Sequence, residues 1–334
     1  MSYTTTLITH DSDYFDHQDE YQNLFARSVN QPFFMLPQYQ NVWWKHLKGG
    51  ELQVIEVRKD GILVGLAPLF LVSDKKTPTL EIIGSFEVSD YLDLLLDKVH
   101  QKAAFEQITT FLIQHSNWNT LFLASLPHTS HTVELFKHCC QQQSWHMAIT
   151  QQDVSPVITL PQTWEEYLQQ LTPSHVSSIK RSLKEVGQED DIEYEVVTTV
   201  DQMKSGVSDF ISLHKKSGAE KAAFWNPARE HFFEEMCETL AKDNLIKLYF
   251  MRVNNERAAS LLIFDYQNEF LVYNSGFDAY RYGHLRVGNV IIAHTIQEAI
   301  RLGRSRYDFM RGDEPYKFTF GGVPEPVWDI TIQR

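Results

Sequence analysis

Residues 307–322 read YDFMRGDEPYKFTFGG and combine several side chains that could act in acid–base chemistry. Aromatic and polar residues alternate at Tyr307, Asp308 and Phe309, which predicts a strand. Gly, Asp and Pro within residues 311–315 then predict a tight turn that ends the strand. This strand end and its turn therefore bring together acidic side chains, an arginine, a lysine and two tyrosines.

A carboxylate and a phenol at this spacing could serve a group transfer as base and acid. Asp308 is the candidate base and Tyr316 the candidate acid, while the Lys317 cation could neutralise a phosphate or a developing oxyanion. Each residue has a structural alternative: Asp308 could cap a turn, and the charged residues could pin a hairpin through salt bridges.

The other charged residues of the turn also have two interpretations. Arg311, Asp313 and Glu314 either bind the group-accepting substrate or order the turn. In the structural alternative, Asp313 pairs with Arg311.

Composition excludes several classes of protein. The 334 residues carry a net charge of −13, which argues against general binding to nucleic acid or to anionic membranes, and so against DNA as a partner. Three cysteines show neither metal-ligand spacing nor a disulfide framework, so we expect no metal and a cytoplasmic location. The start of the chain lacks the pattern of a secretory signal, and we expect no transmembrane segment.

The same order of elements is predicted in both halves of the chain. In the first half, Asp60-Gly61 predicts a hairpin turn, and further strands, a helix at residues 101–114 and a buried strand at 121–124 follow. In the second half, strands at 245–253 and 258–266 meet at Asn254-Asn255. They are followed by a strand at 269–275, a helix at 289–302 and a strand at 306–310. We therefore predict two α/β units packed together, with domains at 1–155 and 156–334.

Helix signals lie between and within these halves. Thr163 with Glu166 predicts a capping box, and Asn226 before Pro227 predicts a helix start. A following helix carries a basic cluster at residues 180–184, which is either a solvated face or a surface near an anion. His214 lies on a helix at 201–216, where a lone histidine is more often structural than catalytic.

The segment 276–289 leads from a strand into a helix and contains two late glycines and three arginine or histidine side chains. A helix start offers free N–H groups and a positive dipole to a phosphate. Arg286, Gly288 and Asn289 are therefore candidate residues for binding a diphosphate. Motifs of serine hydrolases, P-loop NTPases, zinc proteases and dinucleotide-binding enzymes do not occur in the sequence.

Residues 307–322 resemble the signature DFlrGdepYKyrfG of the CelD-like and Fem-like N-acyltransferases, one branch of the GNAT acyltransferase superfamily. The resemblance extends over residues 160–322 and is supported by YNSGFD at 273–278 and KRSLKEV at 180–186. It implies an α/β (α+β) fold of tandem GNAT-like units, with mixed central sheets flanked by helices. The first unit would then be degenerate and have scaffolding and acceptor-side roles.

The resemblance implies an N-acyltransferase that moves an acyl group from acetyl-CoA or another acyl-CoA to an amine. The acceptor would be a small molecule, a sugar or a cell-envelope or polysaccharide precursor. An alternative is a Fem-like aminoacyltransferase that uses charged tRNA as donor. A non-catalytic binding protein and a structural partner in an envelope assembly are further alternatives. The resembled branch ends its loop in SPG where this chain has Arg286-Val287-Gly288, so only the glycine is kept.

The resemblance also implies roles for single residues. Tyr273 and Asn274 would end the strand at which GNAT folds splay and expose a backbone N–H to the thioester carbonyl. Leu213-His214 matches a pair that places His214 near the cleft, and Trp225 would offer a stacking surface to the acceptor.

Overall fold

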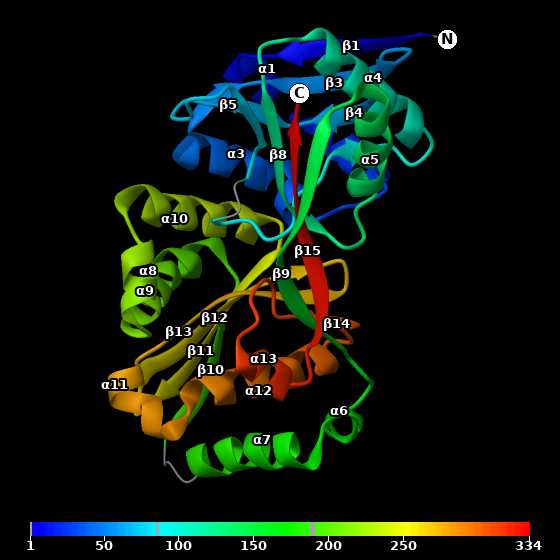
Figure 1. The fold of residues 1–334 in the computed structure, drawn as a ribbon. Helices are drawn as coiled ribbons and strands as arrows, with labels where there is room; N and C mark the ends of the chain where they lie inside the picture. The colour runs from blue at the N-terminus through cyan, green and yellow to red at the C-terminus, as the bar shows by residue number, and fades with distance from the viewer. Residues whose placement is uncertain (1, 85–86, 188–190) are drawn as a thin grey trace. The chain divides into compact units, whose positions relative to one another are not determined.

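The computed structural model describes residues 2–84, 87–187 and 191–334 and divides the chain into two compact units (Figure 1). Unit 1 comprises Met1–Asp153 and Pro326–Arg334, and unit 2 comprises Val154–Glu325. The sequence-based boundary placed residues 326–334 in the second domain instead. They belong to unit 1 because β15 (Val323–Gln333) pairs with β8 (Thr120–Pro127), a contact between residues about 200 positions apart that no local pattern reveals.

Unit 1 contains two sheets. The first has the strand order β1-β3-β4-β7, and the second has the order β15-β8-β6-β5-β2. The strands not yet given are β1 (Tyr3–Ile8), β2 (Gly50–Leu52), β3 (Val54–Lys59), β4 (Ile62–Ala67), β5 (Leu69–Val72), β6 (Thr79–Ile82) and β7 (Leu95–Leu96). The helices are α1 (Asp11–Phe15), α2 (Gln18–Arg27), η1 (Phe33–Met35), α3 (Pro37–Leu47), α4 (Gln101–Gln114) and α5 (Thr132–Gln143).

Local chemistry explains the hairpin of unit 1 and the strand that follows it. Asp60 and Gly61 have φ of 49° and 87°, as a two-residue turn requires, which confirms the predicted hairpin. The apolar run at residues 62–72 is divided at Pro68, because proline has no N–H to donate to a ladder. As a result, β4 lies in the first sheet and β5 in the second.

Unit 2 has the strand order β10-β11-β12-β13-β14-β9. Its strands are β9 (His146–Thr159), which begins in unit 1, β10 (Ile192–Val197), β11 (Ile246–Val253), β12 (Glu256–Tyr266), β13 (Glu269–Phe277) and β14 (Arg306–Asp308). Its helices are α6 (Trp164–Gln170), α7 (Pro173–Val186), α8 (Val200–Lys216), α9 (Ala219–Phe224), α10 (Pro227–Lys242), α11 (Ala279–Tyr282), η2 (Gly283–Leu285), α12 (Val287–Arg301) and α13 (Pro315–Thr319).

The sheet of unit 2 is mixed and has helices on both faces. β13 and β14 are parallel, whereas the other neighbouring strands in this sheet for which pairing is described are antiparallel. α8 packs on the sheet with α9 and α10 beside it, while α12 packs on the opposite face with α7 beneath it (Figure 1). Apolar side chains of β12, such as Leu261 and Ile263, meet those of α12, such as Val290 and Ile296, in a buried core.

Several predicted helix starts and turns are confirmed. Thr163 and Glu166 form a capping box at α6, and the Asn226 side chain accepts a hydrogen bond from the Arg229 N–H at α10. Asn254 and Asn255 both have positive φ in the turn between β11 and β12. These signals are reliable because each one depends on residues that are close together in the chain.

The pairing of β13 changes along its length, and this change shapes the candidate site. Residues 269–271 pair with β14, but β14 ends at Asp308, so the rest of β13 continues without it. Against β12, the register shifts between Leu262↔Asn274 and Ile263↔Val272. Tyr273 is therefore the extra residue of a β-bulge, which increases the local twist. β13 splays from β14 beyond this point.

Gly276 allows α8 to approach β13 closely. A Cβ atom at this position would lie 2.4 Å from the His214 backbone nitrogen and 2.7 Å from the Leu213 carbonyl carbon. Both are backbone atoms of α8, so no side chain can rotate away to make room.

We predict that Gly276→Ala destabilises the protein by about 3 kcal/mol, because α8 and β13 must separate to admit the methyl group. Urea unfolding measures the change. Gly283→Ala is the matched control, since nothing lies within 4 Å of its added Cβ. Equal unfolding midpoints for the two variants would contradict the close approach of α8 to β13.

Candidate functional site

The splayed part of β13 presents backbone groups that β12 does not use. The Asp278 N–H donates to Ala258 O, so by the alternation of an antiparallel ladder Gly276 faces β12 while Ser275 and Phe277 face the other edge. Two bonds confirm this direction: Phe277 N–H donates to Ser217 Oγ at 2.8 Å, and Ser275 O accepts from Lys221 Nζ at 2.6 Å. The Ser275 N–H has no acceptor among the described residues.

A cavity of about 300 Å³ lies beside this edge. Its walls come from β13, from the start of α12 and from α13. The residues that line it are Ser260, Ser275, Gly276, Phe277, Gly283, Arg286, Val287, Gly288, Asn289, Ile291, Ile292 and Tyr316. The structure thus brings four of the predicted site residues together: Arg286, Gly288, Asn289 and Tyr316.

The start of α12 supplies hydrogen-bond donors to the cavity. Arg286 is the N-cap with φ of 53°, and its carbonyl accepts from the N–H groups of Asn289 and Val290. The N–H groups of Val287 and Gly288 precede these and have no acceptor among the described residues. Since the helix dipole is positive at this end, the site favours an anion.

Residue type alone would suggest that the Arg286 charge and a close backbone approach at Gly288 bind the phosphate. The structure gives both residues a smaller part in phosphate binding. The Arg286 side chain forms an ion pair with Glu185 of α7 at 3.3 Å and is about one-third exposed, so part of its charge is already compensated. A Cβ at Gly288 would meet only the Phe277 ring at 3.5 Å, an ordinary contact. The main donors of this site are therefore backbone groups.

Tyr316 lies in the cavity wall as a potential proton donor. Burial, and then the charge of Glu314, raise the pKa of the Tyr316 phenol well above its usual value. The hydroxyl therefore stays protonated at neutral pH. No hydrogen-bond partner for it occurs in the described part of the chain, which leaves its proton available to a bound molecule.

Asp308 has a capping role in the structure. It is 3% exposed at the end of β14, and its Oδ1 accepts from the Met310 N–H at 2.7 Å. Met310 has φ of 58°, so this bond supports a strained turn. Asp308 is absent from the described residues that line the cavity with Gly288. A role as catalytic base stays a prediction, and the observed bond favours the turn-capping alternative.

The position of Lys317 also differs from the expectation that its cation neutralises a phosphate or a developing oxyanion. Its Nζ is buried and lies within 3.1 Å of the carbonyl oxygens of Met310, Arg311 and Gly312, and 2.9 Å from Glu314 Oε2. An ammonium has only three protons, so these four acceptors leave none for a donor phosphate. Lys317 holds the turn in shape instead.

The remaining charged residues of the turn are not among the described residues that line the cavity. Asp313 and Glu314 are exposed, and Arg311 is half-buried. Glu314 pairs with Lys317. Gly312 has φ of 120°, and a Cβ added there would lie 2.4 Å from the Glu314 carboxylate. Binding of an acceptor by these three side chains stays a prediction.

His214 and Trp225 form a buried pair rather than an exposed binding surface. Trp225 is 9% exposed and donates from Nε1 to His214 Nδ1 at 3.0 Å. Indole N–H groups only donate, so His214 carries its own proton on Nε2, which lies 3.2 Å from Asn274 Oδ1. Burial, and then the charge of Lys221, lower the pKa of His214 to about 4. Both ring nitrogens are thus used within the protein.

Tyr273 and Asn274 do not end their strand, because β13 continues to Phe277. Tyr273 is the bulge residue, and its ring packs against Phe233 and Phe264. Asn274 bonds to His214. Their side chains therefore support the splayed strand from behind the cavity, and Ser275 provides the exposed edge.

Sequence reasoning missed Lys221 and Ser275. Lys221 lies in the short helix α9 and bonds to Ser275 through both O and Oγ. Burial is the largest influence on its pKa and lowers it; the charge of Glu314 raises it and that of Lys317 lowers it, and the net shift is downward. Ser275 lay within the YNSGFD segment and could have been found from strand alternation, whereas no local pattern points to Lys221.

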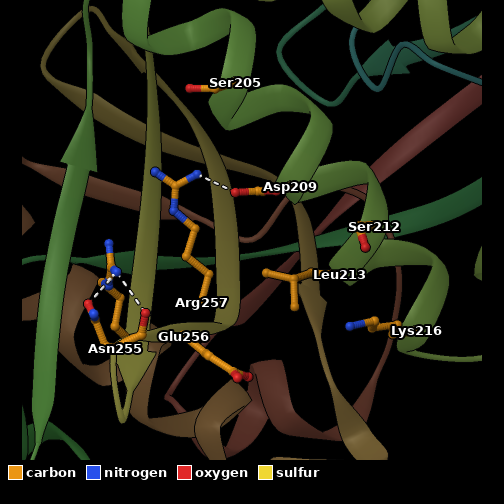
Figure 2. A pocket seen from close by; sticks show the side chains of 9 residues that line it. Ser205, Asp209, Ser212, Leu213, Lys216, Asn255, Glu256 and Arg257 are labelled. Atoms are coloured by element: carbon orange, nitrogen blue, oxygen red, sulfur yellow. Dashed lines mark hydrogen bonds and ion pairs between the residues drawn. The ribbon is translucent and has the colours of Figure 1, made fainter.

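Figure 2 shows a second pocket of unit 2, of about 450 Å³, between α8 and the turn that joins β11 to β12. Its cations are already paired. Arg257 bonds to Asp209 at 2.7 Å and to Glu195 at 3.1 Å, and Lys216 pairs with Asp278 at 3.1 Å. We interpret this pocket as a salt-bridged surface that fixes the hairpin to α8.

Residues 2–84, 87–187 and 191–334 contain no group of three or more His, Cys, Asp or Glu side chains placed to hold a metal. Their helices are also too short or too polar to cross a membrane.

We predict that Lys317→Met lowers the unfolding free energy by about 3 kcal/mol, because three buried carbonyl groups and one carboxylate lose their partner. Chemical denaturation measures the loss. Lys204→Met, at an exposed position on α8, is the control and should change little. A stable Lys317→Met protein would return this lysine to the list of candidate catalytic groups.

The lowered pKa of His214 predicts a pH dependence of stability. The unfolded state binds a proton near pH 6.5 and the folded state only near pH 4, so stability is complete above about pH 6.5 and falls as the pH drops towards 4. The loss should approach about 3 kcal/mol. Comparing unfolding free energies at pH 7 and pH 4.5 checks it, and His214→Gln should remove most of the difference. A variant with an undiminished slope would place the titrating group elsewhere.

Comparisons with known proteins agree with this geometry. The sequence profile of the family described as Acetyltransferase (GNAT) domain matches residues 173–318, which include the open edge of β13, α12 and most of α13. No protein in a curated set of sequences matches the chain significantly.

Solved structures share the fold at low sequence identity. FemX is 11% identical with a TM-score of 0.64, over 98% of this chain and 96% of its own. A conserved protein of unknown function from Bacteroides thetaiotaomicron is 10% identical with a TM-score of 0.61, over 99% and 100%. L-PGS from Bacillus licheniformis is 7% identical with a TM-score of 0.59, over 95% and 91%.

The expected fold class, α/β units with mixed sheets flanked by helices, is confirmed by these matches and by the two compact units. The splayed β13 and the open start of α12 both lie inside the matched segment. Residues 173–318 of this chain thus match the family described as Acetyltransferase (GNAT) domain, within a fold that FemX shares.

Proposed function

We propose that unit 2 transfers an acyl group from an acyl-CoA to an amine. The observation that carries this proposal is the meeting, in one cavity, of the open edge of β13 with the start of α12. An acyl-CoA combines a diphosphate with an amide-containing arm that ends in a thioester. The helix start suits the diphosphate, and the strand edge suits the arm.

The donor would bind mainly through backbone groups. The N–H groups of Val287 and Gly288 would hold phosphate oxygens, with Arg286 adding charge from the N-cap. The Ser275 N–H would donate a hydrogen bond either to an amide carbonyl of the arm or to the carbonyl of the thioester. At the thioester it would stabilise the oxyanion that forms during attack.

Tyr316 would complete the transfer. The amine attacks the thioester carbonyl, the tetrahedral adduct collapses, and the carbon–sulfur bond breaks. The leaving thiolate then takes a proton from the Tyr316 hydroxyl, which its raised pKa keeps protonated at neutral pH. The proton released by the amine passes to a base, for which Asp308 is one candidate and solvent the other.

We propose a sugar or another cell-envelope or polysaccharide precursor as the acceptor, on the strength of the family resemblance. The resemblance to Fem-like enzymes makes charged tRNA an alternative donor, and the experiments below include it. We also propose a cytoplasmic location. The three buried cysteines are free thiols, which is typical of proteins in a reducing compartment.

We predict that CoA and acetyl-CoA bind the wild-type protein in calorimetry and that Gly288→Glu abolishes binding. A glutamate in the first turn of α12 suits the helix dipole and makes only ordinary contact with Phe277, so the variant should fold. Its carboxylate would occupy the anion site. The same change at the exposed Gly49 is the control and should leave binding intact.

Transfer can be measured as the free thiol that is released from acetyl-CoA in the presence of amino sugars and other amines. Tyr316→Phe should lower the rate about a hundredfold while CoA still binds, because only the leaving-group proton is lost. Binding of charged tRNA without any binding of CoA would overturn the proposed donor. Failure of both to bind would favour a non-catalytic protein.

A further inference from the structure

Lys221 is a cation that bonds to Ser275, a residue of the donor-cavity wall, and the proposed transfer does not use it. Its side chain is half-buried, and its Nζ donates to Ser275 O at 2.6 Å and to Ser275 Oγ at 3.3 Å. These two bonds use two of its three donor positions. The third has no acceptor among the residues that the structure describes.

The contact with Ser275 places this amine beside the donor. Ser275 lines the cavity together with Gly288 and Tyr316, and its backbone lies on the open edge of β13. An acyl-CoA whose diphosphate is at the start of α12 and whose arm follows this edge would bring its thioester towards Lys221. Proximity of this kind raises the effective concentration of the reacting groups.

The surroundings of Lys221 also favour the neutral amine, which is the nucleophilic form. Burial has the largest effect and lowers the pKa of Lys221, the nearby Glu314 raises it, and the Lys317 cation lowers it again. The net shift is downward, so at a given pH more of Lys221 is neutral than of an exposed lysine.

We propose that Lys221 is a self-acylation site that accepts the acyl group of a bound acyl-CoA. The Lys221 nitrogen forms an amide bond to the carbonyl carbon, and the carbon–sulfur bond breaks. The amine loses one proton, and the departing thiolate gains one and leaves as free CoA. No oxidant or further reactant is needed. This inference rests on the proposed donor site.

Acylation would change the site in a defined way. An amide nitrogen keeps one N–H and no charge, so it cannot serve both Ser275 O and Ser275 Oγ. The group of Lys221, Lys317 and Glu314 would lose one positive charge. The added acyl chain would lie next to Ser275, which lines the donor cavity, and we therefore expect weaker binding of a second acyl-CoA.

The test uses the full chain, incubated with acetyl-CoA without any amine acceptor and analysed by peptide mass spectrometry. Lys221 should be acetylated at least about tenfold faster than Lys204, an exposed lysine of unit 2 that reports uncatalysed reaction. Gly288→Glu should remove this advantage, because the donor no longer binds. Lys221→Arg should lack the modified peptide.

Calorimetry with CoA separates the two ways in which this result could fail. If CoA binds but Lys221 reacts no faster than Lys204, the self-acylation proposal is wrong, and Lys221 is a structural tie between α9 and β13. The donor site would then stand. If CoA does not bind, both the donor site and the self-acylation proposal are overturned.

Discussion

The early end of β14 is the constraint on which the site of unit 2 depends. A parallel strand that stopped later would have bonded the second half of β13 along its whole edge. Because β14 ends at Asp308, the backbone groups of Ser275 and Phe277 need other partners. Ser217 and Lys221 satisfy three of these groups, and the Ser275 N–H stays open. The bulge at Tyr273 twists β13 away and widens the gap.

The turn after β14 must be held rigidly for this gap to persist. Met310 and Gly312 both have positive φ, a conformation that is costly for methionine. Asp308 caps the turn from one side, and Lys317 binds three of its carbonyl groups from the other. The charged residues Asp308 and Lys317 of the signature at 307–322 therefore hold the turn in shape. Tyr316, next to Lys317, is the member of this signature that faces the cavity.

Sequence patterns predicted the elements well and the side-chain roles less well, for physical reasons. The turn at Asn254-Asn255 and the cap at Asn226 depend on neighbouring residues, so their signals are local. The same holds for the start of α12 after Arg286. The roles of Lys317 and His214 depend on which backbone groups and rings surround them, and residue type alone cannot show that. Lys221 reaches Ser275 over 54 positions in the chain, a contact that no spacing rule detects.

Amide hydrogen exchange with and without CoA tests most directly whether the open edge of β13 and the start of α12 form one donor site. Exchange at these amides depends on whether an acceptor covers them. The account predicts that CoA slows exchange at Ser275, Val287 and Gly288 together, with little change in the ladder between β11 and β12. Protection of the amides at the start of α12 without Ser275, or protection confined to the pocket between α8 and the β11–β12 turn, would contradict it.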